Sequence, residues 1–158
     1  MFMAIGMAVV AVGLGLVMVG NKGARLELEG KFLKVRTLAL NANASLVVVD
    51  FRVTDTADIP YVIKTITMLL TPASGETVEG TPISKQDLDN VFEYQKLLGP
   101  KFNPTLVIRD KLPPHTPVDR VTAARFEIPE ADLELRRNLV LKIDELDGIT
   151  AELAEKKK

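Results

Sequence analysis

Residues 2–20 form an unbroken apolar stretch without a charged side chain. As a helix, this stretch would span roughly 28 Å, close to the roughly 30 Å hydrocarbon core of a bilayer. It is apolar on every side, whereas a helix in a soluble core is usually shorter or amphipathic. The pattern predicts a transmembrane helix over residues 1–21, in a single-pass membrane protein.

A secretory signal peptide that is later removed is the main alternative for this stretch. Such a peptide begins with basic residues, but the first three residues carry no charged side chain. Cleavage also needs small residues at the −3 and −1 positions. Cutting after Gly20 would place Met18 at −3, and cutting after Ala24 would place Lys22 there. We therefore expect the segment to remain as an anchor.

Small residues are spaced regularly along the predicted transmembrane helix. The first line consists of Ala4, Ala8, Ala11 and Gly15, and the second of Gly6, Gly13 and Gly20. Small residues on one face let a second helix approach closely in lipid, although Gly and Ala are also common in membrane helices generally. The lines predict a helix-packing interface with a second copy of the chain or with a larger membrane complex.

The charges after the apolar stretch bear on which side of the membrane the rest of the chain lies. The sequence that follows carries Lys22, Arg25, Lys31, Lys34 and Arg36, whereas the α-amino group is the only positive charge before the stretch. The positive-inside rule therefore favours the cytoplasmic face. An N-terminal anchor before a β domain is, however, typical of export, and long domains cross despite their charges. Both orientations stay open.

Beyond residue 24 the apolar pattern takes on a period of two, which is typical of strands. In residues 45–56, one face carries Val47, Val49, Phe51 and Val53, and the other Val48, Asp50, Arg52 and Thr54. Gly30 is expected to kink or end an earlier strand within residues 24–40. Further strands are predicted at 61–71, 78–83, 105–110, 118–129, 139–146 and 149–154, and Asp147–Gly148 is a strong hairpin signal for the last two.

Residues 84–98 show helical periodicity instead. Ser84 is suited to cap the helix, with Asp87 three residues later, and Gly99–Pro100 ends it. We expect this amphipathic helix to cover an open end or an edge of a sheet. A turn of helix is also expected after Pro129.

Short strands at spacings of about ten residues predict a mainly β fold: an antiparallel β-sandwich with one inserted amphipathic helix. The predicted organisation is a transmembrane helix (1–21), a sandwich domain (22–153) and a charged tail (154–158). The net charge is −1 and the chain has no cysteine. The charge argues against nucleic acid as a partner, and the absence of cysteine excludes disulfides and thiolate metal sites.

Two stretches resemble small immunoglobulin-like domains of the late-embryogenesis-abundant type 2 kind and bacterial sandwich domains with an F-x-V-x-N-T motif. They are "VVVDFRVTDTADIPYVIKTITMLLTPASGETVEG" and "LPPHTPVDRVTAARFEIPEAD". Asp55 stands where Asn is usual, and His115 where Gly is usual. The resemblance implies a membrane-anchored interaction or accessory domain and supplies no catalytic residue.

Few residues suggest chemistry. His115 is the only histidine and lies in a proline-rich loop. Asp144, Glu145 and Asp147 crowd the last hairpin, but without the spacing of a calcium loop, and Asp55 and Asp58 fit turn chemistry. Ser84 has a capping role and no histidine near it in sequence. Arg136–Arg137 and Lys156–Lys158 could touch acidic lipids, although a solvated surface explains them as well.

We therefore predict a protein that is not an enzyme and has no catalytic, cofactor-binding or metal-ligating residue. The leading interpretation is an accessory or assembly-stabilising subunit of a larger membrane complex, whose partners are other transmembrane helices and the lipid bilayer. The alternative is a membrane-tethered binding module that captures a protein, peptide or lipid by a sheet edge or an end loop. An enzyme with unrecognised residues is a third interpretation.

Overall fold

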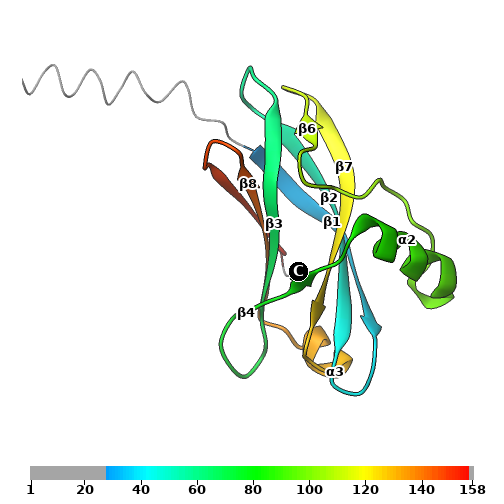
Figure 1. Ribbon diagram of the computed structural model, residues 1–158. Coiled ribbons are helices and arrows are strands. Elements are labelled where there is room, and N and C mark those ends of the chain that lie inside the picture. The colour runs from blue at the N-terminus through cyan, green and yellow to red at the C-terminus, as the bar shows by residue number, and fades with distance from the viewer. Residues whose placement is uncertain (1–27, 157–158) are drawn as a thin grey trace, which may run out of the picture.

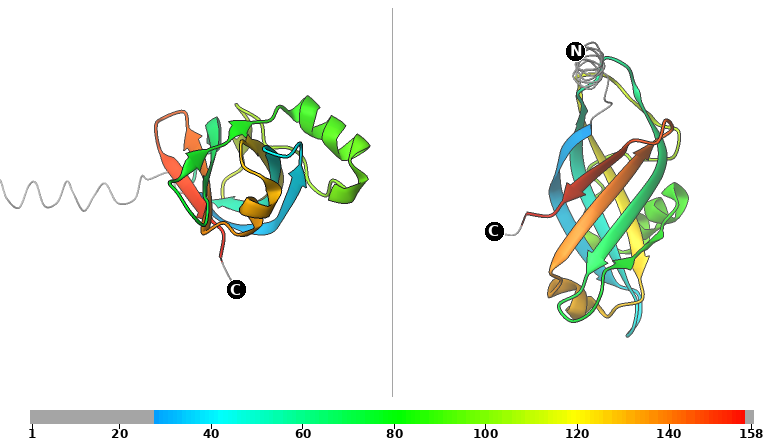
Figure 2. Two further views of the ribbon diagram at one scale, coloured as in Figure 1. Left: turned by 90° about the horizontal axis from the view of Figure 1, so that it is seen from below. Right: turned by 90° about the vertical axis from the view of Figure 1, so that its left-hand side faces the viewer.

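The computed structural model describes residues 28–156, which form two antiparallel sheets packed face to face (Figures 1 and 2). The first sheet has the order β1 (Leu28–Ala39), β2 (Ser45–Asp55), β7 (Pro117–Phe126) and β5 (Thr81–Pro82). The second has the order β4 (Val78–Glu79), β3 (Tyr61–Thr71), β8 (Asn138–Glu145) and β9 (Thr150–Ala154), with β6 (Lys111–Leu112) beside β3. The predicted mainly β, antiparallel sandwich is confirmed.

The predicted transmembrane helix lies outside the described residues, as do its small-residue lines. Those lines hold the proposed packing residues Ala4, Ala8, Ala11, Gly15, Gly6 and Gly13. Between residues 28 and 156, no helix is both long enough and apolar enough to cross a bilayer.

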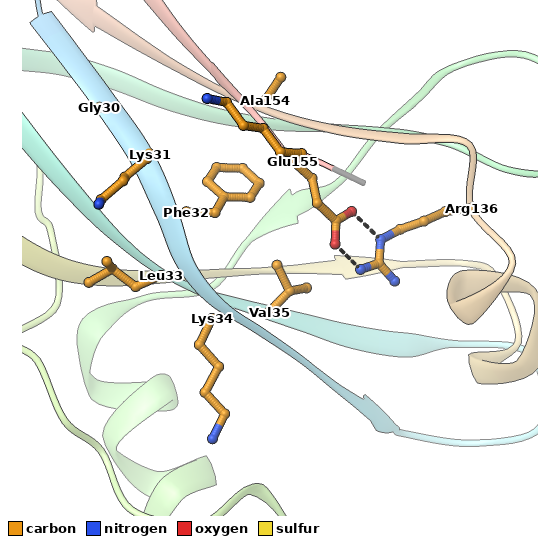
Figure 3. Close-up of a pocket in the computed structure, with 10 residues that line it drawn as sticks. Gly30, Lys31, Phe32, Leu33, Lys34, Val35, Arg136, Ala154 and Glu155 are labelled. Atoms are coloured by element: carbon orange, nitrogen blue, oxygen red, sulfur yellow. Dashed lines mark hydrogen bonds and ion pairs between the residues drawn. The ribbon is translucent and has the colours of Figure 1, made fainter. Parts of the chain in front are cut away.

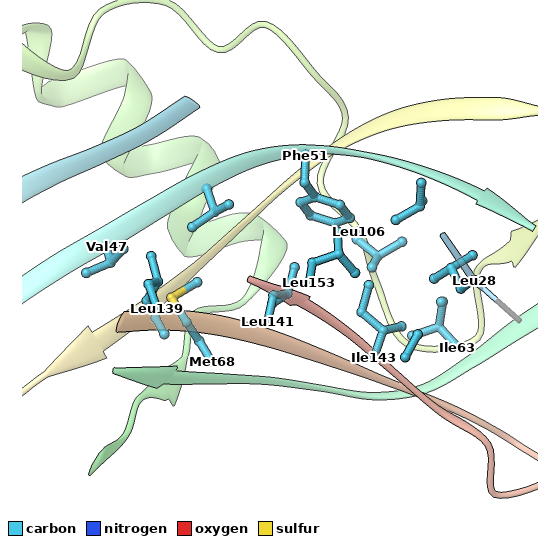
Figure 4. Packing of buried hydrophobic residues seen from close by; sticks show 14 of the residues in the cluster. Leu28, Val47, Phe51, Ile63, Met68, Leu106, Leu139, Leu141, Ile143 and Leu153 are labelled. Atoms are coloured by element: carbon cyan, nitrogen blue, oxygen red, sulfur yellow. The ribbon is translucent and has the colours of Figure 1, made fainter. Parts of the chain in front are cut away.

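The main core fills the space between the two sheets (Figure 4). Phe51 and Val47 point inward from β2, and Ile63, Leu141 and Ile143 meet them from the second sheet. These side chains alternate with outward-facing ones because successive residues of a strand point to opposite faces. The four residues that the pattern of β2 groups on one face, Val47, Val49, Phe51 and Val53, all belong to this core.

A second, smaller core lies on the outer face of the first sheet, beneath α2 (Lys85–Tyr94). Leu88 of α2 is fully buried there, and Leu46 and Val48 of β2 lie in the same cluster. Helix α2 therefore covers a sheet face, so the expectation of an end or an edge was wrong. Ser84 caps the helix as predicted, because its hydroxyl accepts a hydrogen bond from the Asp87 N–H (3.1 Å).

A buried ion pair lies between the first sheet and the segment that follows α2. An Arg36 Nη donates to an Asp50 carboxylate oxygen (2.7 Å), and the two side chains are 7% and 3% exposed. The other Arg36 Nη donates to the Leu98 and Pro100 carbonyls, at 2.9 and 2.8 Å. The second Asp50 oxygen accepts from the Asn103 amide (2.8 Å). These bonds tie η2 (Lys96–Leu98) and the following loop to β1 and β2.

Three local predictions need correction. Residues 78–83 form two short strands in different sheets, because the chain crosses between the sheets at Gly80. A Cβ there would lie 2.7 Å from Ala124 and Phe126 atoms. Residues 105–110 are not a strand: Thr105 makes one isolated bridge to β7. Gly30 does not end β1, which continues to Ala39.

The helical turn expected after Pro129 is present as α3 (Glu130–Glu134).

Candidate functional site

His115 does not belong to a catalytic constellation in the structure. Its Nε2 lies 2.7 Å from an Asp58 carboxylate oxygen, and both side chains are exposed. Its main-chain N–H donates to the Asp55 carbonyl (2.7 Å), and its φ of 55° is that of a tight turn. The pair joins two loops at one end of the sandwich. Across residues 28–156, no group of three or more His, Asp or Glu side chains is placed to hold a metal ion.

The acidic residues of the last hairpin point in different directions. Glu145 is buried, and its carboxylate accepts from the Asp147 N–H (2.5 Å) inside the turn. Asp144 accepts hydrogen bonds from the hydroxyls of Thr150 (2.6 Å) and Thr65 (2.5 Å) on the neighbouring strands. The carboxylates of Asp144 and Glu145 thus each have a partner in the hairpin or the sheet, and this hairpin forms no cluster suited to a metal ion.

The hydrogen bonds from Thr150 and Thr65 hold the pKa of the Asp144 carboxyl below its ordinary value of 3.8. A lowered pKa in the folded state stabilises the fold above pH 3.8, and this stabilisation is lost as the pH falls through the folded-state value. We expect Thr150→Val to raise the Asp144 pKa, measured by NMR titration of its carboxyl carbon. Thr116→Val, whose hydroxyl donates to the Pro114 carbonyl, should leave it unchanged. An unchanged pKa in Thr150→Val would contradict this assignment.

The first surface hollow lies along the seam between β1 and β9, the two edge strands that face each other (Figure 3). Phe32 and Val35 line it from β1, and Arg136 and Glu155 close it with a two-bond ion pair, at 2.8 and 2.5 Å. Arg136 is therefore bound within the domain instead of offering its charge to lipid. Its neighbour Arg137 donates to the carbonyls of the β3–β4 turn.

The seam has the features of a protected strand edge. Lys31, Lys34 and Lys156 surround the hollow, and β1 carries a bulge between Phe32 and Lys34. Lysines and bulges on edge strands discourage other strands from pairing with them. We therefore do not take the seam as a binding site.

The second hollow is a groove of about 690 Å³ beside β3, and we regard it as the candidate binding site. It lies between β3 and β7, which Figure 1 shows at the front of the sandwich. Its apolar lining includes Ile66, Ile83, Leu106 and Ile108. Ile108 is 61% exposed, which is high for a large apolar side chain that packs against no core.

The wall on the β7 side is already paired. Leu106 donates its N–H to the Val121 carbonyl (3.0 Å), and Val121 donates to the Pro104 carbonyl (2.9 Å). Farther along β7, the short strand β5 pairs with Arg125 and Ala124. On this side of the groove, a bound partner would therefore meet mostly side chains and few unpaired main-chain N–H and C=O groups.

The wall on the β3 side differs, because part of this strand has a neighbour on one side only. β8 follows β3 over most of its length, but β6 pairs only with Tyr61 and Val62, and β4 only with Leu69 and Leu70. Within the described part of the chain, no strand pairs with residues 64–67 on the side away from β8. Three of these four residues, Thr65, Ile66 and Thr67, line the groove.

The backbone of Ile66 is turned toward this groove. Main-chain N–H and C=O groups alternate between the two sides of a strand. The Met68 carbonyl accepts from the Gly80 N–H (2.9 Å) on the side away from β8. Ile66, two residues earlier, has the same orientation as Met68. One donor and one acceptor therefore face a groove with apolar side chains, which is what an added extended strand requires.

The groove contains no set of groups suited to catalysis. Its charged lining residues are Glu79 and Lys85, from β4 and the first turn of α2. Lys85 is engaged with Asp89 one turn later (2.8 Å). Three threonines also line it, Thr65, Thr67 and Thr122, and the Thr65 hydroxyl donates to the Asp144 carboxylate (2.5 Å) on the neighbouring strand. The arrangement fits binding of a strand.

No protein-family model matches the sequence, and no curated protein matches it. Two solved structures have a similar arrangement. One is an uncharacterized beta-sandwich protein from Clostridium difficile 630, with 8% identity, a TM-score of 0.42, and coverage of 82% of this chain and 86% of that one. The other is Northeast Structural Genomics Consortium target SoR45, with 11% identity, a TM-score of 0.37, and coverage of 84% and 81%.

Proposed function

We propose that this chain is a non-enzymatic, single-pass membrane protein that serves as an accessory subunit of a larger membrane complex. Residues 1–21 would anchor it, and the domain that follows, a sandwich of the immunoglobulin-like kind, would dock on a neighbouring subunit. The length and uniform apolarity of residues 2–20 support the anchor. The small residues Gly13 and Gly15 support contact with a second helix.

The observation that carries the docking role is the unpaired stretch of β3 beside the groove. An extended segment of a partner would pair with the main chain of Ile66 and place alternate side chains against Ile83 and Ile108. Main-chain hydrogen bonds supply affinity in such pairing, and the apolar wall supplies selectivity. The edge is short, so the partner would contribute one strand of a few residues.

The same groove also favours a second candidate function, a membrane-tethered module that captures a soluble peptide. The two functions differ in how long the bound complex lasts. A subunit stays with its complex through detergent extraction, whereas a captured peptide exchanges. The core between the sheets is filled by side chains from both of them (Figure 4), so the groove, at the surface, is the place where either partner would bind.

The test is affinity purification of the tagged full chain from its native membrane, with Ile108→Asp placed in the groove. We expect this variant to lose co-purifying proteins, because a carboxylate in the apolar wall opposes burial by a partner. Leu97→Asp is the matched control, since Leu97 is 93% exposed and lies outside the groove. Equal recovery of partners with both variants would rule out docking through the groove.

A second pair of variants tests the anchor independently. Gly13→Leu and Gly15→Leu each place a large side chain in one of the small-residue lines, which would keep a second helix from approaching closely. We expect these variants to weaken association with the complex while the chain stays in the membrane. Unchanged association would count against helix packing. Loss of the chain from the membrane fraction on removal of residues 2–20 would support the anchor, and retention would contradict it.

A further inference from the structure

Two loops and a turn lie together at the end of the sandwich where β1 begins. Leu28 pairs with Asp55 at the end of β2, and Asp55 forms a bridge with Pro114. Leu146, at the turn between β8 and β9, donates its N–H to the Val62 carbonyl near the start of β3. We call this the proximal end: loops 56–60 and 113–116 and the turn 146–148. In Figure 2 (right), the start of the blue strand β1 and the turn between the orange and red strands β8 and β9 lie toward the same end.

Two large apolar side chains stand out from the proximal end. Ile59 is 57% exposed at the tip of the β2–β3 loop, and Leu146 is 54% exposed in the β8–β9 turn. Turns of this kind are normally polar, because they face water. Each tip also has an acidic neighbour, Asp58 and Asp147 respectively, so attraction to an anionic surface does not explain the two tips.

The length of chain before β1 limits how far this end can lie from a bilayer. Only residues 21–27 separate the apolar stretch from Leu28. Seven residues span at most about 25 Å when fully extended. If residues 2–20 cross the membrane, the start of β1 therefore lies within that distance of the surface.

We infer that the proximal end rests on the bilayer and inserts Ile59 and Leu146 into its interfacial region. This inference rests on the proposed anchor, and it fixes the orientation of the sandwich. Aliphatic side chains at two loop tips gain by leaving water, and the acidic neighbours stay at the headgroup level. The opposite end, with α3 and Leu135, points away from the membrane; the Thr37–Glu130 hydrogen bond (3.1 Å) places α3 near the far end of β1.

The experiment uses the full chain in phosphatidylcholine nanodiscs. The chain has no cysteine, so each single-cysteine variant takes one environment-sensitive fluorophore. Ile59→Cys and Leu146→Cys report on the proximal end. Leu135→Cys and Leu97→Cys are matched controls, since these leucines are 68% and 93% exposed and lie elsewhere. Thermal unfolding of each variant verifies that the fold is retained.

We expect both proximal labels to emit at shorter wavelength, to be quenched by spin-labelled lipid and to resist quenching by iodide. The control labels should show the reverse. If iodide quenches either proximal label as strongly as the label at Leu135→Cys, the proximal end does not rest on the bilayer. That result would leave the proposed anchor intact. If the chain instead separates from the nanodiscs during size-exclusion chromatography, the proposed anchor is refuted. The contact of the proximal end with the bilayer is then refuted as well.

Discussion

Replacing Asp50 by alanine is expected to destabilise the domain by about 3–5 kcal/mol. The substitution leaves the Arg36 guanidinium buried beneath the segment after α2 without its carboxylate, and it leaves the Asn103 amide without an acceptor. Coulomb attraction to Asp50 and bonds to two carbonyls now offset the desolvation of Arg36. Once the carboxylate is gone, the remaining carbonyls supply only part of that compensation. Equilibrium urea unfolding followed by circular dichroism measures the loss.

The exposed ion pair between Arg52 and Asp119 provides the control for Asp50→Ala. Its side chains are 46% and 33% exposed, so Asp119→Ala should cost no more than about 1 kcal/mol. Replacing both Arg36 and Asp50 by leucine should recover much of the Asp50→Ala loss, because no unpaired charge remains buried. Equal losses for Asp50→Ala and Asp119→Ala would show that burial does not govern the strength of the inner pair.

Replacing Phe51 by alanine is expected to cost about 3–5 kcal/mol. Its ring is fully buried between the sheets, and the main core contains residues of both sheets. Truncation removes apolar contacts and leaves a cavity that the paired strands cannot close. The midpoint of thermal or urea unfolding should fall accordingly.

Phe102→Ala is the matched control for Phe51→Ala. Phe102 is 61% exposed, and its ring contacts the cations of Lys34 and Arg36, each 5.5 Å from the centroid. Contacts of this kind at exposed sites are worth about 0.5–1 kcal/mol. A loss in Phe102→Ala as large as in Phe51→Ala would mean that the outer cluster, not the space between the sheets, dominates stability.

The sequence predicts the long strands well, because each pairs along most of its length and buries one face or both. The alternation in β2 correctly groups the four residues that face the main core. It also holds a signal that the prediction did not use: Val47, Val48 and Val49 are consecutive, which is typical of a strand covered on both sides. That signal places α2 on a sheet face, where the amphipathic pattern alone leaves its location open.

The prediction fails where a local pattern depends on distant neighbours. Residues 105–110 are β-branched and apolar enough for a strand, yet only Thr105 and Leu106 reach β7, and Arg109 has a φ of 72°. The groove beside β3 could not be predicted from the sequence either, because it also depends on which distant strands lie next to β3. Its threonines and isoleucines are ordinary strand residues, and the unpaired edge arises because β4 and β6 are short. Asp50, a charge inside an apolar strand, was the visible sign of the buried ion pair.

The burial of β2 on both faces has a consequence for synthesis of the protein. β7, which pairs with β2, is complete only when the chain reaches residue 126. At about 5–20 residues per second, the ribosome needs roughly 4 to 15 s to go from Phe51 to that point. Throughout this time, residues 45–51 present a β-prone apolar segment in which Asp50 is the sole charge. Because a charge inside a β-prone apolar segment opposes its aggregation, we expect Asp50 to protect the nascent chain before its ion pair is enclosed.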